Sequence, residues 1–384
     1  MMKRFMRNNQ PDKKLNGTFR SRKMDTALFL MALSLICTLA FWNLPAGASG
    51  AIASWNSKTA SAYLDQRTVS WMHNGGAMDH GTFCISCHTA FPYALAQYAL
   101  QTSSGERTPS PVYSQLIASV TKRVHLWTED QPYLNNKAQG PGTESVLNAM
   151  VLANYGSGSQ KLSPLTLQAL KIMWSQQLKS GQNAGAWPWF NYGNEPWEAQ
   201  DSQYWGAALA AVTVGTLPQA YRYDPDIQDN LRLLKEYLLH DLQEQSLQNR
   251  LTLLWASTKW QGLLNADRKA EIVHAAMVKQ HSDGGWSASD LIPPTWKHGD
   301  GTPQETKSDG YGTGFVTFVI EQSGIPHTQG AIKAGRLWLM RNQNQSEGFW
   351  TAYSLNRKLD PTSGEGKFMC DAATGYAILA LTTK

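Results

Sequence analysis

QNQSEGFW, at Gln343–Trp350, is one of three stretches that are built in the same way. The others are QHSDGGW at Gln280–Trp286 and QLKSGQNAGAW at Gln177–Trp187. In each, a glutamine near the predicted end of a helix is followed by Gly-x-Trp. Glycine allows the backbone to approach a neighbour closely, and the indole then packs over the helix end. The recurrence predicts three copies of one helix–turn unit.

A second type of segment alternates with these turns. It is an apolar helix that has small residues along one face and opens on a polar or acidic residue, as in DSQYWGAALAAV and CDAATGYAILAL. Six copies begin, about 45 to 62 residues apart, at Ser86, Thr143, Asp201, Ser246, Ser308 and Cys370. Each interval leaves room for a second helix and two loops. Because period-2 alternation is scarce, the sequence predicts an all-α fold.

The turns resemble the Gln…Gly-x-Trp repeats of the terpenoid-cyclase and prenyltransferase-like superfamily, in its squalene–hopene cyclase branch. The copy with Trp338, Gln343, Gly348 and Trp350 is a close match. The resemblance covers roughly residues 84–384. It implies a single (α/α)6 toroid, in which an inner ring of helices encloses a cavity and an outer ring packs around it. Residues 49–83 are then an N-terminal approach segment.

The first 48 residues differ from the rest of the chain. A basic head up to Lys23 precedes an apolar run of 16 residues, Ala27–Trp42, and then the small residues Ala46-Gly47-Ala48. This order is typical of a secretory signal peptide that is cleaved before Ser49, so we expect an exported protein, periplasmic or otherwise extracytoplasmic. An uncleaved anchor is the alternative, and it is the one route by which the sequence predicts membrane association.

The net charge of +5 comes from this leader, which holds eight of the 34 Lys and Arg but two of the 29 Asp and Glu. The remaining chain is close to neutral, so its composition does not favour nucleic-acid binding. Cleavage also removes one of the 4 cysteines. The three that remain are Cys84, Cys87 and Cys370, and an odd number is not a disulfide framework.

The segment Cys84-Ile85-Ser86-Cys87-His88 concentrates two cysteines and a histidine. In an exported protein, Cys-x-x-Cys-His is the attachment signal for c-type haem: each cysteine forms a thioether bond, and His88 is the proximal iron ligand. The alternatives are a disulfide, a redox pair or part of a zinc site. We therefore predict covalent haem c, with an apolar small molecule or a redox protein as the partner.

The distal haem ligand is left open. Met369 is one candidate, because closing a six-repeat ring brings the start of the last inner helix beside the start of the first. Thioether ligation would raise the reduction potential. Met72, His73, Met78 and His80, in the glycine-containing stretch before the Cys-His segment, are the other candidates.

Zinc is the alternative cofactor. Related α/α toroids hold zinc at the mouth with Cys, His and Asp, so the resemblance implies this possibility. Ring closure would bring Cys370 toward Cys84, Cys87 and His88, and three thiolates with one imidazole satisfy a structural zinc ion.

Three aspartates, Asp201, Asp309 and Asp371, stand at the starts of predicted inner helices. They are candidate catalytic acids, but an aspartate in this position is also a common N-terminal cap. The sequence lacks the Asp-x-Asp-Asp cluster that the resemblance would require for protonating a polyene. We therefore expect that the protein does not cyclise squalene or oxidosqualene.

The predicted function is electron transfer, or redox chemistry on an apolar ligand, by an exported haem c toroid. One alternative is an isoprenoid or terpenoid cyclase, or a prenyltransferase-like enzyme, with a Cys/His zinc site. The other is a non-catalytic toroid that binds a lipid or a glycan. No catalytic residue is assigned beyond the three candidate aspartates.

Overall fold

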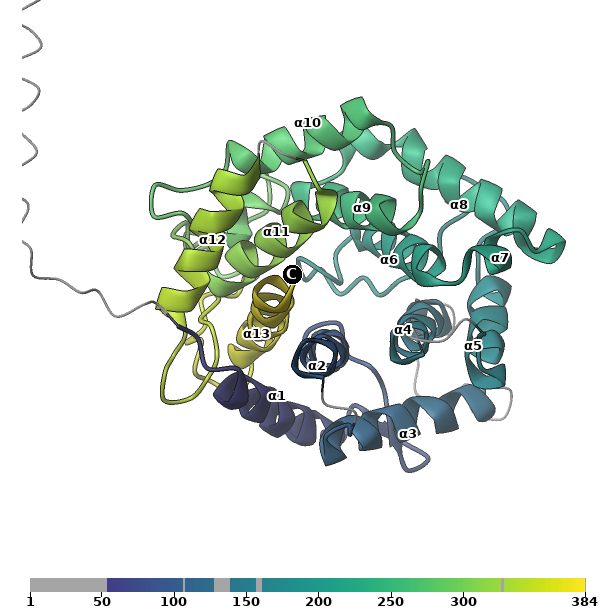
Figure 1. Cartoon of the computed structure of the whole chain (residues 1–384), viewed down its shortest axis with the longest axis horizontal. Coiled ribbons are helices and arrows are strands. Elements are labelled where there is room, and N and C mark those ends of the chain that lie inside the picture. Colours follow the sequence, from purple (N-terminus) through teal and green to yellow (C-terminus); the bar gives the residue numbers. More distant parts are fainter. Residues whose placement is uncertain (1–53, 106–107, 128–138, 157–160, 326–327, 384) are drawn as a thin grey trace, which may run out of the picture. The chain divides into compact units, whose positions relative to one another are not determined.

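The computed structural model describes residues 54–105, 108–127, 139–156, 161–325 and 328–383. The signal peptide predicted at residues 1–48 lies outside these ranges. Within the unit Ala53–Lys384, the helices form two concentric rings (Figure 1). Among the described residues, no helix has both the length and the apolar character needed to span a bilayer.

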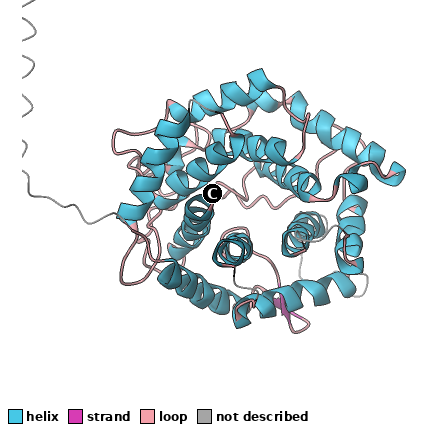
Figure 2. Ribbon diagram, in the orientation of Figure 1, coloured by secondary structure: helices cyan, strands magenta, loops and turns pink. Residues whose placement is uncertain are grey.

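The inner ring consists of helices that lie side by side around the centre (Figures 1 and 2). They are α2 (Ala90–Ser104), α4 (Gln139–Tyr155), α6 (Ser202–Thr216), α9 (Leu247–Lys259), α11 (Gly310–Ser323) and α13 (Lys367–Thr382). Each contacts the next, and α13 contacts α2, which closes the ring. All six begin within a few residues of their predicted starts. The prediction of an all-α toroid is confirmed.

The outer ring surrounds these helices. It consists of α1 (Ser57–Met72), α3 (Pro111–His125), α5 (Pro164–Ser175), α8 (Gln228–His240), α10 (Ala266–Met277) and α12 (Gln329–Asn342). The connections contain α7 (Gln219–Arg222) and three 3₁₀ turns, η1 (Pro225–Ile227), η2 (Leu242–Glu244) and η3 (Ala288–Asp290). Strands β1 (Met78–Asp79) and β2 (Thr82–Phe83) form a short antiparallel hairpin, magenta in Figure 2. Because α1 contacts α2 and α13, the ring takes in a helix that precedes Cys84.

Small residues let the inner helices approach one another closely. A Cβ on Gly314 of α11 would lie 2.8 Å from the backbone of Ala377 on α13. A Cβ on Gly375 of α13 would lie 2.6 Å from Pro92 on α2. The outer helices are instead amphipathic: α8 buries Leu231, Leu234 and Leu238 along one stripe. This division explains why the inner segments are apolar all round.

The three Gly-x-Trp turns occupy equivalent places, as predicted. Each follows an outer helix, and each tryptophan is fully buried. The indole N–H donates to a carbonyl near the end of that helix, and the pairs are Trp187–Met173, Trp286–Ala276 and Trp350–Leu339. The tryptophans therefore satisfy carbonyl groups that helix ends leave unpaired.

The glutamines of these turns join successive outer helices. Gln343 donates through Nε2 to the carbonyl of Gly348 in its own turn and to the carbonyl of Asn56, the N-cap of α1. Gln177 and Gln280 make the equivalent pairs of bonds. Gly348 adopts φ +89°, and a Cβ there would lie 2.3 Å from the carbonyl oxygen of Thr59. The Gln343 turn thus closes the outer ring, and it requires glycine.

Candidate functional site

Loops cover the end of the toroid at which the inner helices begin. Asn356, in the loop 351–366, accepts from the backbone N–H of Glu195 and donates to the Glu195 carbonyl. Trp296, in the loop 287–308, donates to the carbonyl of Leu355. These bonds link the loop 351–366 to each of the other two, and Asn356 therefore positions Glu195.

One cavity, here called the mouth cavity, lies between the loop 188–201 and the start of α13. Its volume is about 300 Å³. The side chains that matter most for its chemistry are His88, Glu195, Trp197, Glu198, Phe368 and Met369. Glu365 and Arg357, which form an ion pair, also line it, so the cavity combines aromatic faces with three carboxyl groups and one guanidinium group.

A second cavity, here called the side cavity, lies beside the start of α6. Its volume is about 600 Å³. Its lining includes Glu195, Asp201, Tyr204, Tyr237 and Trp296. Glu195 borders both cavities, so the two are adjacent compartments of one site.

Glu195 and Asp201 are neighbouring carboxyl groups that interact with each other. Burial, together with the neighbouring Asp201, raises the pKa of Glu195 from its ordinary 4.5 to about 8. Burial also raises the pKa of Asp201, while hydrogen bonds from Ser246 and Glu195 oppose the rise. Both carboxyl groups therefore ionise less readily than usual.

Glu198 is half-buried in the mouth cavity. Burial raises its pKa to about 7. A carboxyl group with this pKa exchanges its proton near neutral pH and can donate a hydrogen bond to a neutral ligand. Of the three glutamates that line the mouth cavity, Glu198 is therefore partly neutral near pH 7.

His88 lies at the start of α2 with an apolar environment around its ring. Phe368 stacks on the imidazole with ring centroids 3.9 Å apart, and Trp71 meets it edge-on at 5.0 Å. Nδ1 lies 2.8 Å from Thr89 Oγ1. Burial, and secondarily Arg67, lowers the pKa of His88 to about 3. The imidazole is therefore neutral at pH 7, which is the form that binds a metal.

Cys84 and Cys87 are free thiols beside this histidine. Burial raises the pKa of Cys84 to about 12 and also raises that of Cys87. Two reduced thiols and a neutral imidazole are the donor set that haem c attachment requires, so the residues fit the group. Haem c at Cys84, Cys87 and His88 stays a prediction, which the visible absorption spectrum of the purified protein would test.

The candidates for the distal ligand fall in different places. Met369 is buried and shares the mouth cavity with His88. Met72 is buried at the end of α1, and His73 is exposed. Met78 and His80 lie on the exposed hairpin, where His80 pairs with Asp79. The structure thus brings Met369, but not the hairpin residues, into the cavity of His88.

Cys370 is buried in α13, and its thiol donates to the carbonyl of Pro361 at 3.5 Å. Within the described ranges, no three His, Cys, Asp or Glu side chains are placed together as a metal site. Zinc stays an untested alternative.

Asp309 is an N-terminal cap. Its Oδ1 accepts from the backbone N–H groups of Tyr311 and Gly312 at the start of α11. Its Oδ2 accepts from the N–H of Ala288. The capping role anticipated for this residue is what the structure shows.

Asp371 has a different role from the one expected, because it lies inside α13 rather than at its cap. Oδ1 accepts from Tyr63 Oη at 2.8 Å and from Arg67 Nε at 2.7 Å, and Oδ2 accepts from Thr89 Oγ1 at 2.6 Å. Tyr63 and Arg67 belong to α1, and Thr89 precedes α2. Asp371 therefore joins the last helix to the first two.

Of the three candidate aspartates, Asp201 is thus the one that lines a cavity. Sequence reasoning missed Glu195, Trp197 and Glu198, which line the mouth cavity. The available signal was their density: the segment Trp187–Glu198 holds three tryptophans and two glutamates in a connection between helices.

Comparison with known proteins shows which solved structures have a similar fold. No protein-family model matches the sequence, and a search of curated proteins finds no similar chain. Among solved structures, the chain is similar to an inactive variant of the α-1,6-mannanase GH76A of Salegentibacter sp. HEL1_6 in complex with α-1,6-mannotriose. The identity is 11%, the match covers 85% of this chain and 99% of that chain, and the TM-score is 0.51.

The chain shares its α/α toroid fold with that protein. It is also similar to a possible member of the GH105 family from Klebsiella pneumoniae, with 11% identity, coverage of 88% and 94%, and a TM-score of 0.49. The resemblance to squalene–hopene cyclases is thus borne out only at the level of the toroid.

These findings correct the predicted function. The solved structure whose toroid fold this chain shares is named an α-1,6-mannanase, not a redox protein. The prediction of electron transfer, or of redox chemistry on an apolar ligand, is therefore wrong. The alternative of a glycan-binding toroid fits the comparison better.

Proposed function

We propose that the protein binds a glycan across the mouth cavity and the side cavity. The observation that carries the proposal is the adjacency of two compartments, about 300 and 600 Å³, that share Glu195 and combine aromatic with hydrogen-bonding side chains. Sugar rings offer apolar faces, which pack on aromatic rings, and hydroxyl edges, which hydrogen-bond. Pockets that bind small molecules use the same combination.

Two glutamates in the cavities can donate hydrogen bonds to an uncharged ligand. Glu195 and Glu198 keep protons near neutral pH because burial raises their pKa values to about 8 and about 7. Half-buried Trp296 presents its ring to the side cavity. The name of the solved neighbour, a mannanase in complex with α-1,6-mannotriose, supports a glycan as the class of ligand.

The test is isothermal titration of the purified protein with α-1,6-mannotriose and with other neutral trisaccharides. Trp296→Ala should weaken binding about tenfold, the usual cost of truncating a central aromatic contact. Trp260→Ala is the matched control, because Trp260 is also half-buried but caps the opposite end of α9. A wild-type protein that binds none of these saccharides would refute the proposal, as would equal losses in both variants.

Glycoside hydrolysis is a second candidate, favoured by the half-buried carboxyl group of Glu198 in the mouth cavity. Such hydrolysis usually needs an acid and a second carboxylate. The neighbour's inactive variant has two adjacent aspartates replaced, and this chain has no two consecutive aspartates. If the wild-type protein releases reducing ends from a glycan and the Glu198→Gln variant does not, hydrolysis is favoured. If the wild-type protein binds the glycan without releasing reducing ends, the protein is a binding protein.

A further inference from the structure

Three polar side chains are buried together behind the mouth cavity. Trp197 belongs to the loop 188–201, whereas Gln248 and Tyr311 are each the second residue of an inner helix, α9 and α11. Their exposed fractions are 6%, 1% and 0%. Trp197 lines the mouth cavity, and its ring meets that of Tyr311 edge-on with centroids 5.4 Å apart. We call these three residues the floor cluster.

The polar atoms of the floor cluster have no hydrogen-bond partner among the described residues. They are Trp197 Nε1, Gln248 Oε1, Gln248 Nε2 and Tyr311 Oη. Burial raises the pKa of Tyr311, and weak hydrogen bonding from Trp197 and Gln248 opposes this rise. Both side chains therefore lie beside the hydroxyl group, but none of their contacts with it has the geometry of a full hydrogen bond. Leaving a buried polar group unpaired costs about 1–3 kcal/mol. Four such atoms in one place are a cost that a bound ligand can offset.

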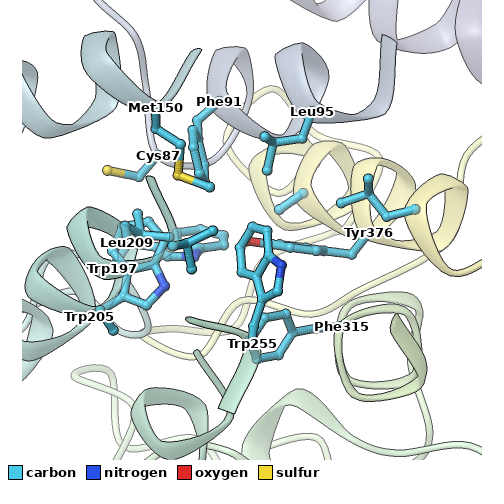
Figure 3. Packing of buried hydrophobic residues seen from close by; sticks show 14 of the residues in the cluster. Cys87, Phe91, Leu95, Met150, Trp197, Trp205, Leu209, Trp255, Phe315 and Tyr376 are labelled. Atoms are coloured by element: carbon cyan, nitrogen blue, oxygen red, sulfur yellow. The ribbon is translucent and has the colours of Figure 1, made fainter. Parts of the chain in front are cut away.

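Other buried tryptophans show that the fold can satisfy an indole N–H where its role is structural. Trp187, Trp286 and Trp350 all donate to helix carbonyls. Trp205 on α6, in contrast, shares the unpaired state of Trp197. Figure 3 shows both side chains among the residues that face one another inside the inner ring. Trp255 on α9 is unpaired as well, so what sets Trp197 apart is that it also lines the mouth cavity.

We propose that Trp197, Gln248 and Tyr311 form a hydrogen-bonding subsite for the hydroxyl groups of a neutral sugar residue at the inner end of the bound glycan. The indole donates, and the amide and the phenol both donate and accept, which matches neighbouring hydroxyl groups. None of the three carries a charge at pH 7, so the cluster itself provides no partner for the carboxylate of an acidic sugar. This inference rests on the proposed glycan binding and assigns its inner recognition residues.

The test uses one substitution at two places. Tyr311→Phe removes a hydroxyl group from the floor cluster. Tyr113→Phe removes one from α3 in the outer ring, where Tyr113 is equally buried and its hydroxyl is also unpaired. Because neither hydroxyl bonds within the protein, both variants should keep or raise the melting temperature. In titrations with α-1,6-mannotriose, Tyr311→Phe should weaken binding roughly three- to tenfold, the value of one hydrogen bond, and Tyr113→Phe should not.

Gln248→Met is the second variant, since methionine has a similar volume and no amide. It should weaken binding by at least as much as Tyr311→Phe, because it removes both a donor and an acceptor. If the wild-type protein binds the trisaccharide and both variants bind it equally well, the floor cluster is not a subsite, while glycan binding stands. If the wild-type protein binds no neutral saccharide, both proposals fail together.

Discussion

Asp371 and the floor cluster are both buried at the end of the toroid where the inner helices begin, but their hydrogen bonding is opposite. Asp371 accepts hydrogen bonds from Tyr63, Arg67 and Thr89, so both of its carboxylate oxygens have partners. Trp197, Gln248 and Tyr311 leave four polar atoms unpaired. The first region joins α1, α2 and α13 and has a structural role. The second lies behind a cavity.

The contrast shows what distinguishes a site from a structural contact in this fold. An aspartate on an inner helix looks like a catalytic residue in the sequence. In the structure, however, the hydrogen bonds of Asp371 join the last inner helix to the first helices of the toroid. The floor cluster is neutral and has no recognisable motif, and its unmet hydrogen bonds behind a cavity are the basis of the proposed subsite. The two regions are distinguished by whether their polar atoms have hydrogen-bond partners, and not by their residue types.

The largest effect should come from breaking the ring closure. Asp371→Asn removes the charge that compensates Arg67, whose side chain is 14% exposed. Losing one partner of a buried ion pair typically costs about 3–5 kcal/mol, and the lower end is expected because Arg67 retains some contact with solvent. Denaturant unfolding measures this loss of stability.

Glu236→Gln on α8 is the control, because it breaks an exposed ion pair with Arg232. It should leave the midpoint of unfolding nearly unchanged. If Asp371→Asn were as stable as the wild type, the ring closure would not depend on this residue, and the comparison between the two regions would fail.

A smaller effect is expected from pH. Glu195 and Glu198 have folded pKa values of about 8 and about 7, above the ordinary 4.5. The folded protein therefore holds more protons than the unfolded chain between about pH 4.5 and pH 8, so these groups make stability fall as pH rises through that window. Unfolding measured at several pH values should show a shallower decline in the double variant Glu195→Gln/Glu198→Gln. The same decline in both proteins would mean that neither glutamate is perturbed.

Much of the fold was predictable because its signals are local. Gln343, Gly348 and Trp350 lie within one turn, and their spacing alone indicates a helix end that packs against the next outer helix. The small residues of the inner helices repeat in the same way, since each must approach two neighbours.

The site was predictable only in part, because its partners are distant in the sequence. Asp201, Asp309 and Asp371 look alike, yet one interacts with Glu195, one caps a helix, and one binds Arg67. Glu195 itself is positioned by Asn356, 161 residues away. No periodicity in the chain encodes these pairings.

The central claim is that the unpaired groups at the mouth of the toroid bind a glycan, and the indole N–H resonances of a ¹⁵N-labelled protein test it most directly. Trp187, Trp286 and Trp350 donate to helix carbonyls and serve as internal references, whereas the N–H of Trp197 is unpaired. Replacing each tryptophan in turn by phenylalanine assigns the signals. On addition of α-1,6-mannotriose, the Trp197 resonance should shift in a saturable way while the three references stay in place. A Trp197 signal that does not move at saturating trisaccharide would contradict the account.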